Sequence, residues 1–141
     1  MKIKIAGIGS CIPEKKVSNT DFGEHVFLNE DGTAFGYPNE VVIKKFKGIT
    51  GIEHRRYAED YLTSSDLAFF ASQKAIENAG INPETIDYII FAHNFGDVKY
   101  GTSQSDMIPS LATRVKHKLQ IKNPKCVAYD ILFGCPGWIE G

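Results

Sequence analysis

The chain has 141 residues, of which 43% are hydrophobic and 23% charged, and its formal net charge is −1. This length allows one domain with a sizeable core, and the balanced charge gives no electrostatic basis for binding nucleic acid. No apolar run is long enough to span a bilayer, and the opening apolar stretch is too short and broken for a signal peptide, so a cytoplasmic location is expected.

The chain has three cysteines, Cys11, Cys126 and Cys135. A disulfide framework is not expected, because the count is odd and no secretion signal precedes them. No cysteine or histidine cluster has the spacing of metal ligands, so the sequence predicts neither a metal nor another cofactor. Cys11 follows one apolar stretch and Cys126 begins another, and both are assigned to packing.

The first half of the chain predicts short elements joined by turns. The alternating opening favours a strand, and a short helix capped by Ser18 or Asn19 should follow. Asp-Gly, a second Gly and Pro then indicate a surface loop, which we interpret as an insertion. The ranges are a strand over 2–9, a helix over 20–28, the loop over 29–38, a helix from Asn39 to a stop at Gly48, and an extended basic segment after Gly51.

The second half alternates helices with apolar strands. A helix capped by Thr63 or Ser64 should end at Gly80, and the continuous apolar strand after it is typical of a parallel strand covered on both faces. The later elements are that strand over 86–92, a polar loop over 93–106, a helix over 107–121 with Pro109 in its first turn, a strand over 125–131 and the start of a helix. This order predicts an α/β fold with a mainly parallel or mixed sheet and covering helices.

The stretch "YDILFGCPGW" places Cys135 between an apolar strand and a Pro-Gly that can open a helix. With Pro136 at the first helical position, Cys135 would be the N-cap or lie beside it. The free amides and dipole of such a helix favour a thiolate, and a sharp strand-to-helix corner holds the side chain outward. A buried cysteine in a tight turn is the alternative, and the context favours the nucleophile.

A nucleophilic cysteine needs a base or an oxyanion donor. His25, His54 and His117 lie in polar segments and are assigned to the surface. His93 ends a predicted strand and enters the loop at the same sheet edge as Cys135, so it is a candidate for substrate binding, against the alternative of an ordinary polar residue at a strand end.

Several segments together resemble the N-terminal part of β-ketoacyl-acyl carrier protein synthase III, a thiolase-superfamily enzyme. They are "IKIAGIGSCIPEKKVSN", "ITGIEHRRY", "AIENAGINPETIDYIIFA", "MIPSLATRVKHKLQI" and "AYDILFGCPGW". The resemblance implies that residues 1–141 form an N-terminal thiolase-like domain, half of a two-fold-repeated fold, cut just after the nucleophile turn. A longer enzyme is therefore expected, and this part alone should be inactive.

The resemblance also implies a reaction. Cys135 would take an acyl group from acyl-CoA or an acyl carrier protein (ACP), and malonyl-ACP would then decarboxylate and condense with it, in fatty acid or related secondary lipid or polyketide synthesis. A histidine and an asparagine beyond residue 141 would complete the site. Met107 and Ile108 would reach an acyl pocket, often that of the partner subunit in a homodimer. ACP and acyl-CoA are the expected partners.

The sequence departs from the family pattern near both substrates. Lys45 and Ile49 stand where relatives that use acyl-CoA often carry a tryptophan and an arginine, which puts CoA priming in doubt. Phe133 and Pro136 replace small residues beside the cysteine, and Trp138 is bulky, so an altered acyl or acceptor pocket is expected. Two alternatives stay open: a cysteine acyltransferase of the same superfamily without condensation, and a non-catalytic module that binds a partner chain.

Overall fold

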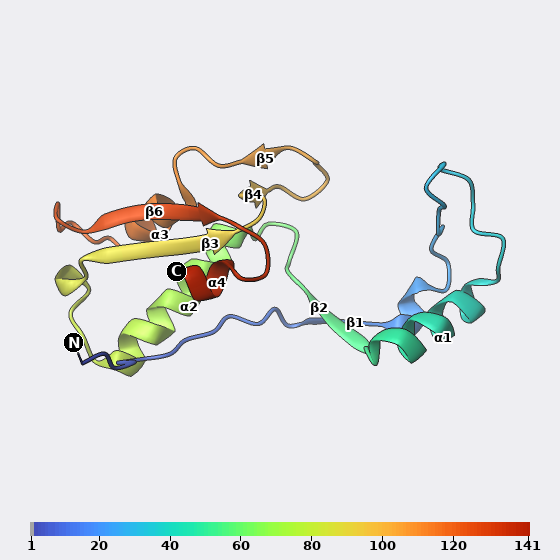
Figure 1. Ribbon diagram of the computed structural model, residues 1–141, viewed down its shortest axis with the longest axis horizontal. Coiled ribbons are helices and arrows are strands. Elements are labelled where there is room, and N and C mark those ends of the chain that lie inside the picture. Colours follow the sequence, from blue (N-terminus) through green and yellow to red (C-terminus); the bar gives the residue numbers. More distant parts are fainter. Residues whose placement is uncertain (1) are drawn as a thin grey trace. The chain divides into compact units, whose positions relative to one another are not determined.

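The computed structural model describes residues 2–141, which form two compact units (Figure 1). The sheet unit comprises residues 2–12 and Asp60–Gly141, and the small unit comprises Pro13–Glu59.

The sheet unit is built on two parallel strands, β3 (Tyr88–His93) and β6 (Val127–Leu132). They pair in register from Tyr88 opposite Val127 to His93 opposite Leu132, as the parallel arrows of Figure 1 show. The chain between them forms a small antiparallel hairpin and a helix. These are β4 (Asp97–Val98), β5 (Ser105–Asp106) and α3 (Leu111–Lys118). The α/β prediction with a parallel sheet is confirmed.

One face of this sheet is covered and the other is largely open within the described residues. Helix α3 packs on β3 and β6 and contributes the fully buried Leu111, Ala112 and Val115. Helix α2 (Ser64–Ala79) packs in turn on α3. Along β3 and β6 the side chains alternate between faces, and the open face carries Tyr88, Ile90, Val127 and Tyr129, which are 64%, 36%, 47% and 42% exposed. The predicted burial on both faces is therefore wrong for this chain, because only the short α4 (Gly137–Glu140) contacts the second face.

Helix α2 matches its prediction in position and capping. Thr63 is its N-cap, and the Asp66 carboxylate accepts hydrogen bonds from the Thr63 backbone N–H and hydroxyl at 2.9 and 2.7 Å. Gly80 ends it in the left-handed conformation. Lys118 at the end of α3 donates to Asp66, so one carboxylate both caps α2 and joins it to α3. The turn η2 (Pro83–Thr85) then leads to β3.

The predicted strand over residues 2–9 is wrong. These residues pair with no strand of the described chain, and Ile3 and Ile5 are each 81% exposed. The segment instead lies along α2, where the Ile8 amide donates to the Asn78 side chain at 3.0 Å. A Cβ on Gly9 would lie 2.2 Å from a carbonyl oxygen of α2, so only glycine permits this close approach.

The small unit pairs β1 (Lys15–Ser18) antiparallel with β2 (His54–Tyr57) and adds η1 (Asn19–Phe22) and α1 (Asn39–Thr50). The helix predicted over 20–28 is only the single turn η1, because the chain turns away at Gly23. Helix α1 continues past Gly48 and ends at Gly51, whose φ is +69°. The predicted loop over 29–38 and the extended segment after Gly51 are confirmed.

The Asn39 side chain does not cap α1, since Pro38 takes that position. The Asn39 amide instead donates to the carbonyls of Gly23 and His25, both at 2.7 Å. These two bonds anchor the loop before α1 to the start of that helix.

Candidate active site

The corner that follows β6 presents Cys135 to solvent. Phe133 extends the strand pairing by one bond, from its amide to the His93 carbonyl at 3.2 Å. The chain then turns, with the Gly137 amide donating to the Gly134 carbonyl at 2.9 Å, and α4 begins. Pro136 is the N-cap of α4 and not its first residue, so Cys135 lies one position before the cap. The predicted strand, turn and helix around an exposed thiol are all found.

The other two cysteines have different surroundings. Cys126 is only 4% exposed, beside the first residue of β6, and Cys11 is partly buried. All three thiols are free. The packing assignment of Cys126 agrees with its burial, and exposure alone makes Cys135 the most accessible thiol.

The imidazole of His93 is fully engaged inside the sheet unit. Its Nδ1 accepts a hydrogen bond from the Gly96 amide at 2.9 Å, which places the proton on Nε2, and Nε2 donates to Asp130 at 3.0 Å. The side chain is only 6% exposed. Both ring nitrogens are thus bonded within the sheet unit, and the expected substrate-binding role of His93 stays a prediction. The His93 carbonyl binds Phe133, two residues before the cysteine.

Asp130 is the centre of this arrangement and was not among the predicted site residues. Its two carboxylate oxygens accept from the backbone amides of Leu111 and Ala112 at 2.7 and 2.8 Å, besides His93. These amides lie in the first turn of α3, where a carboxylate is favoured by the helix dipole. The sequence signal was an acidic residue inside the apolar run "CVAYDIL", which a buried strand accepts only with partners.

The hairpin between β3 and α3 is held by a second charged network. Asp97, 5% exposed, accepts from the Ser65 amide and hydroxyl at 2.8 and 2.7 Å and from Arg114 at 2.9 Å. Arg114 also donates to Asp106 at 2.6 Å and to the Pro109 carbonyl at 3.0 Å. The hydrogen bond from Arg114 holds the pKa of Asp106 below its ordinary value, and the same bond raises the pKa of Arg114. One guanidinium thus links both hairpin strands to α3.

The remaining predicted site residues are Met107, Ile108 and Phe133, which are 40%, 88% and 51% exposed. The hairpin leaves the carboxyl end of β3 and the Cys135 corner leaves the carboxyl end of β6, and parallel pairing brings these two ends to one edge of the sheet. Gly96 follows β3 with a φ of +77°, where a Cβ would lie 2.6 Å from the Met107 side chain. This glycine lets the hairpin fold back closely on Met107.

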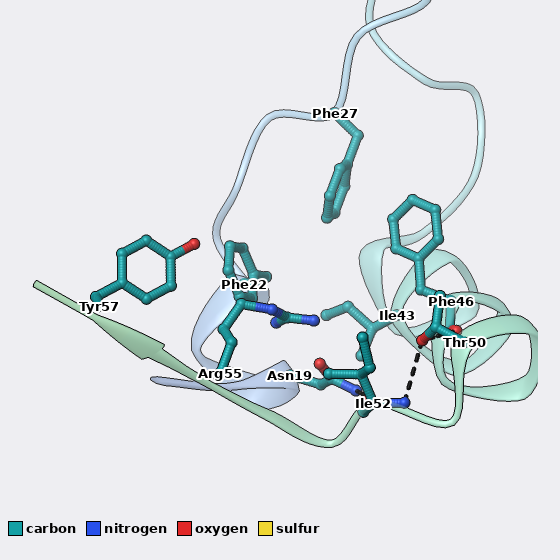
Figure 2. Close-up of a pocket in the computed structure, with 9 residues that line it drawn as sticks. All are labelled: Asn19, Phe22, Phe27, Ile43, Phe46, Thr50, Ile52, Arg55 and Tyr57. Carbon is teal, nitrogen blue, oxygen red and sulfur yellow. Dashed lines mark hydrogen bonds between the residues drawn. The ribbon is translucent and has the colours of Figure 1, made fainter. Parts of the chain in front are cut away.

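The small unit holds a separate aromatic pocket of about 310 Å³, shown in Figure 2. Phe22, Phe27 and Phe46 form walls around it, and the Arg55 guanidinium extends across it toward Ile43. Its other lining residues are Asn19, Thr50, Ile52 and Tyr57. A neighbouring cavity, also about 310 Å³, includes Lys45 and Ile49 together with Phe35 and Tyr37 of the 29–38 loop.

Metal clusters and membrane-spanning helices are both absent from residues 2–141. These residues contain no group of three or more histidine, cysteine or acidic side chains arranged to hold a metal. None of their helices combines the length and apolar character needed to cross a membrane.

A parallel β-α-β unit with an exposed cysteine at a strand-to-helix corner is compatible with a thiolase-type fold. Solved structures agree: the 3-oxoacyl-(acyl-carrier protein) synthase of Burkholderia xenovorans superposes with a TM-score of 0.73 at 26% identity, covering 97% of this chain and 33% of that chain. β-Ketoacyl-[acyl carrier protein] synthase III of Thermus thermophilus gives a TM-score of 0.71 at 28% identity, covering 98% and 36%. OleA of Xanthomonas campestris has the same fold at 20% identity.

In sequence, the chain is similar to β-ketoacyl-[acyl-carrier-protein] synthase III over nearly its whole length, which confirms the resemblance. It is 37% identical to synthase III 1 of Vibrio cholerae over 99% of the chain, and 34% identical to that of Halalkalibacterium halodurans over 97%. The chain spans 37% and 36% of the length of these two relatives. No protein-family model matches it.

Proposed function

We propose that the chain carries the nucleophile of an acyl-thioester condensing enzyme of the β-ketoacyl-ACP synthase III type. The observation that carries the proposal is the exposed Cys135 at the strand-to-helix corner, in a chain similar throughout to such synthases. The Cys135 thiolate attacks the carbonyl of an acyl thioester and expels the carrier thiolate. Malonyl-ACP then loses CO₂, and its carbanion attacks the acyl-enzyme to give 3-oxoacyl-ACP and free Cys135.

The other groups that this reaction needs come from a second body. His93 ends the strand paired with the strand before Cys135, and both of its ring nitrogens are already bonded within the sheet unit. The apolar open face of β3 and β6 supports the same proposal, because parallel sheets are normally covered on both faces. We propose that the covering body supplies the histidine and asparagine expected from the resemblance. The part described here is then inactive alone.

Met107, Ile108 and Phe133 are proposed to line the acyl site. All three are apolar and exposed, and the segments that carry them leave one edge of the sheet. Ile108, the most exposed at 88%, suits a contact with a second copy of the protein in a homodimer. The bulk of Phe133, two residues before the cysteine, should alter the shape of the acyl or acceptor pocket.

For the acyl donor we propose acyl-CoA or acyl-ACP, with ACP as the malonyl carrier. Lys45 and Ile49, at the positions where relatives hold CoA, share their cavity with Phe35 and Tyr37 of the inserted loop. These rings can stack an adenine and so replace the tryptophan that is missing. No metal or other cofactor takes part in this chemistry. The three free thiols fit the proposed cytoplasmic location, where thiols are kept reduced.

The test is thiol labelling followed by acyl transfer. A short pulse of iodoacetamide on the chain should modify Cys135 well before Cys126, with Cys11 intermediate, as read by peptide mass spectrometry. Cys135→Ser should remove the fast adduct, whereas the matched Cys126→Ser should keep it. In the complete protein, an acyl-CoA or acyl-ACP should leave a thioester on Cys135.

Two results would contradict the proposal. If Cys135 is labelled no faster than Cys11, the assignment of Cys135 as the nucleophile is wrong. An acyl group found on another residue would show the same. Release of CO₂ from malonyl-ACP by the acylated protein separates condensation from simple acyl transfer, because an acyltransferase without condensation releases none.

A further inference from the structure

The small unit places a cation in an apolar setting. The Arg55 guanidinium lies 5.1 Å from the centre of the Phe22 ring, over its face. Figure 2 shows it projecting into the space bounded by Phe27, Phe46 and Ile43. Phe27 and Phe46 meet edge to face at 5.9 Å, so two walls of the pocket are held against each other.

Arg55 has neither an ion-pair nor a hydrogen-bond partner among residues 2–141. The acid nearest to Arg55 in the sequence, Glu53, lies just before β2 and is paired with Lys47. Arg56, the next residue on the strand, points to the opposite face and donates to the Glu14 carbonyl at 2.7 Å. Two adjacent arginines thus differ sharply: one is satisfied by the protein, and the other faces a pocket with its donors free.

A guanidinium in apolar surroundings is stabilised by an anion that accepts its parallel N–H groups. The pocket volume of about 310 Å³ is at the lower end of small-molecule sites, roughly 300–1,000 Å³, so a long acyl chain does not fit. The phenylalanine walls favour a flat ring, which prefers stacked or edge-to-face contacts.

We propose that this pocket binds a small aryl carboxylate, with its ring against Phe27 and Phe46 and its carboxylate on Arg55. Every residue that lines the pocket belongs to the small unit, whereas Cys135 belongs to the sheet unit. The pocket also differs from the neighbouring cavity that contains Lys45 and Ile49.

The experiment titrates the full chain with cinnamate and benzoate, followed by calorimetry and by NMR of the phenylalanine ring protons. Cinnamamide tests the charge, acetate tests the ring, and inorganic phosphate and CoA test for a general anion or nucleotide site. We expect saturable binding of cinnamate, with cinnamamide and acetate each weaker by about tenfold or more. Arg55→Gln should weaken cinnamate by a similar factor, and the matched Arg56→Gln by less than about twofold.

The ligand series on the unaltered chain decides the question even if Arg55→Gln fails to fold. Absence of saturation, cinnamamide binding equal to cinnamate, or phosphate or CoA binding as tightly as cinnamate would each overturn the proposal. Equal loss in the Arg55→Gln and Arg56→Gln variants would overturn it too, because it would reveal only a diffuse charge effect.

Discussion

Replacing Asp130 by asparagine should loosen the start of α3 and the end of β3 together. The carboxylate accepts three hydrogen bonds, from the amides of Leu111 and Ala112 and from His93, at 2.7, 2.8 and 3.0 Å. Bonds to a charged acceptor contribute about 1.5–3 kcal/mol each, and a buried donor left without a partner costs about 1–3 kcal/mol. Asparagine keeps one oxygen and turns an amide group toward one of these donors.

The expected loss is about 3 kcal/mol, the sum of one orphaned donor and weaker bonds from the others. A chain of 141 residues has a total stability of about 7–21 kcal/mol at the usual value per residue, so Asp130→Asn should still fold. With a urea slope of about 1–3 kcal/mol per molar, the unfolding midpoint should fall by about 1–3 M.

Urea unfolding followed by circular dichroism measures this change, and amide hydrogen exchange at Leu111 and Ala112 locates it. The control is Asp106→Asn, since the Asp106 side chain is 54% exposed and its ion pair should contribute less than about 1 kcal/mol. The reasoning is refuted if Asp130→Asn costs no more than this control. It is also refuted if the two α3 amides exchange at the same rate in both variants.

Two further changes probe other contacts of the sheet unit. Gly9→Ala puts a Cβ 2.2 Å from a carbonyl of α2, so the Ile8 amide should lose protection from exchange, whereas Gly36→Ala, with no atom within 4 Å, should have no effect. For Asp66, burial raises the pKa but the hydrogen bonds from Lys118 and Thr63 outweigh it, so the pKa lies below 3.8. A carboxylate whose pKa is lowered by folding stabilises the fold at any pH above its pKa in the unfolded chain. This stabilisation is lost as the pH falls through the pKa of the folded state. Asp66→Asn should therefore unfold more readily than the unaltered chain at about pH 7 and equally at about pH 2; a difference that persists in acid would contradict this.

The helices and strands that the sequence predicted well are those whose signals are local. Helix α2 carries its own N-cap at Thr63 and its own stop at Gly80, and both act within one turn of the helix. The prediction of a strand over residues 2–9 was wrong because alternating polarity indicates only that one face of the segment is in contact. It does not indicate which element makes that contact. That face meets α2 through Gly7 and Gly9, and no strand of the described chain pairs with it.

In the candidate site, too, the local features were predicted and the long-range contacts were not. A strand, a turn and a Pro-Gly in succession were enough to predict the exposed corner at Cys135, because the corner is built from neighbouring residues. Asp130 and Arg114 act across 18 and 17 residues of sequence, on Ala112 and Asp97. Such pairs become visible only once β3, β6 and α3 are placed.

The two networks have one consequence for the proposed chemistry. Asp130 fixes His93, whose carbonyl holds the start of the cysteine corner, and the same carboxylate fixes the first turn of α3. Arg114, on α3, in turn fixes the hairpin that leads to Met107. The proposed nucleophile and the proposed acyl-site residues are therefore both linked through hydrogen bonds to one buried carboxylate, although it contacts neither. A change at Asp130 should then disturb acylation of Cys135 and the selection of the acyl group together, whereas a change at Arg114 should affect the selection alone.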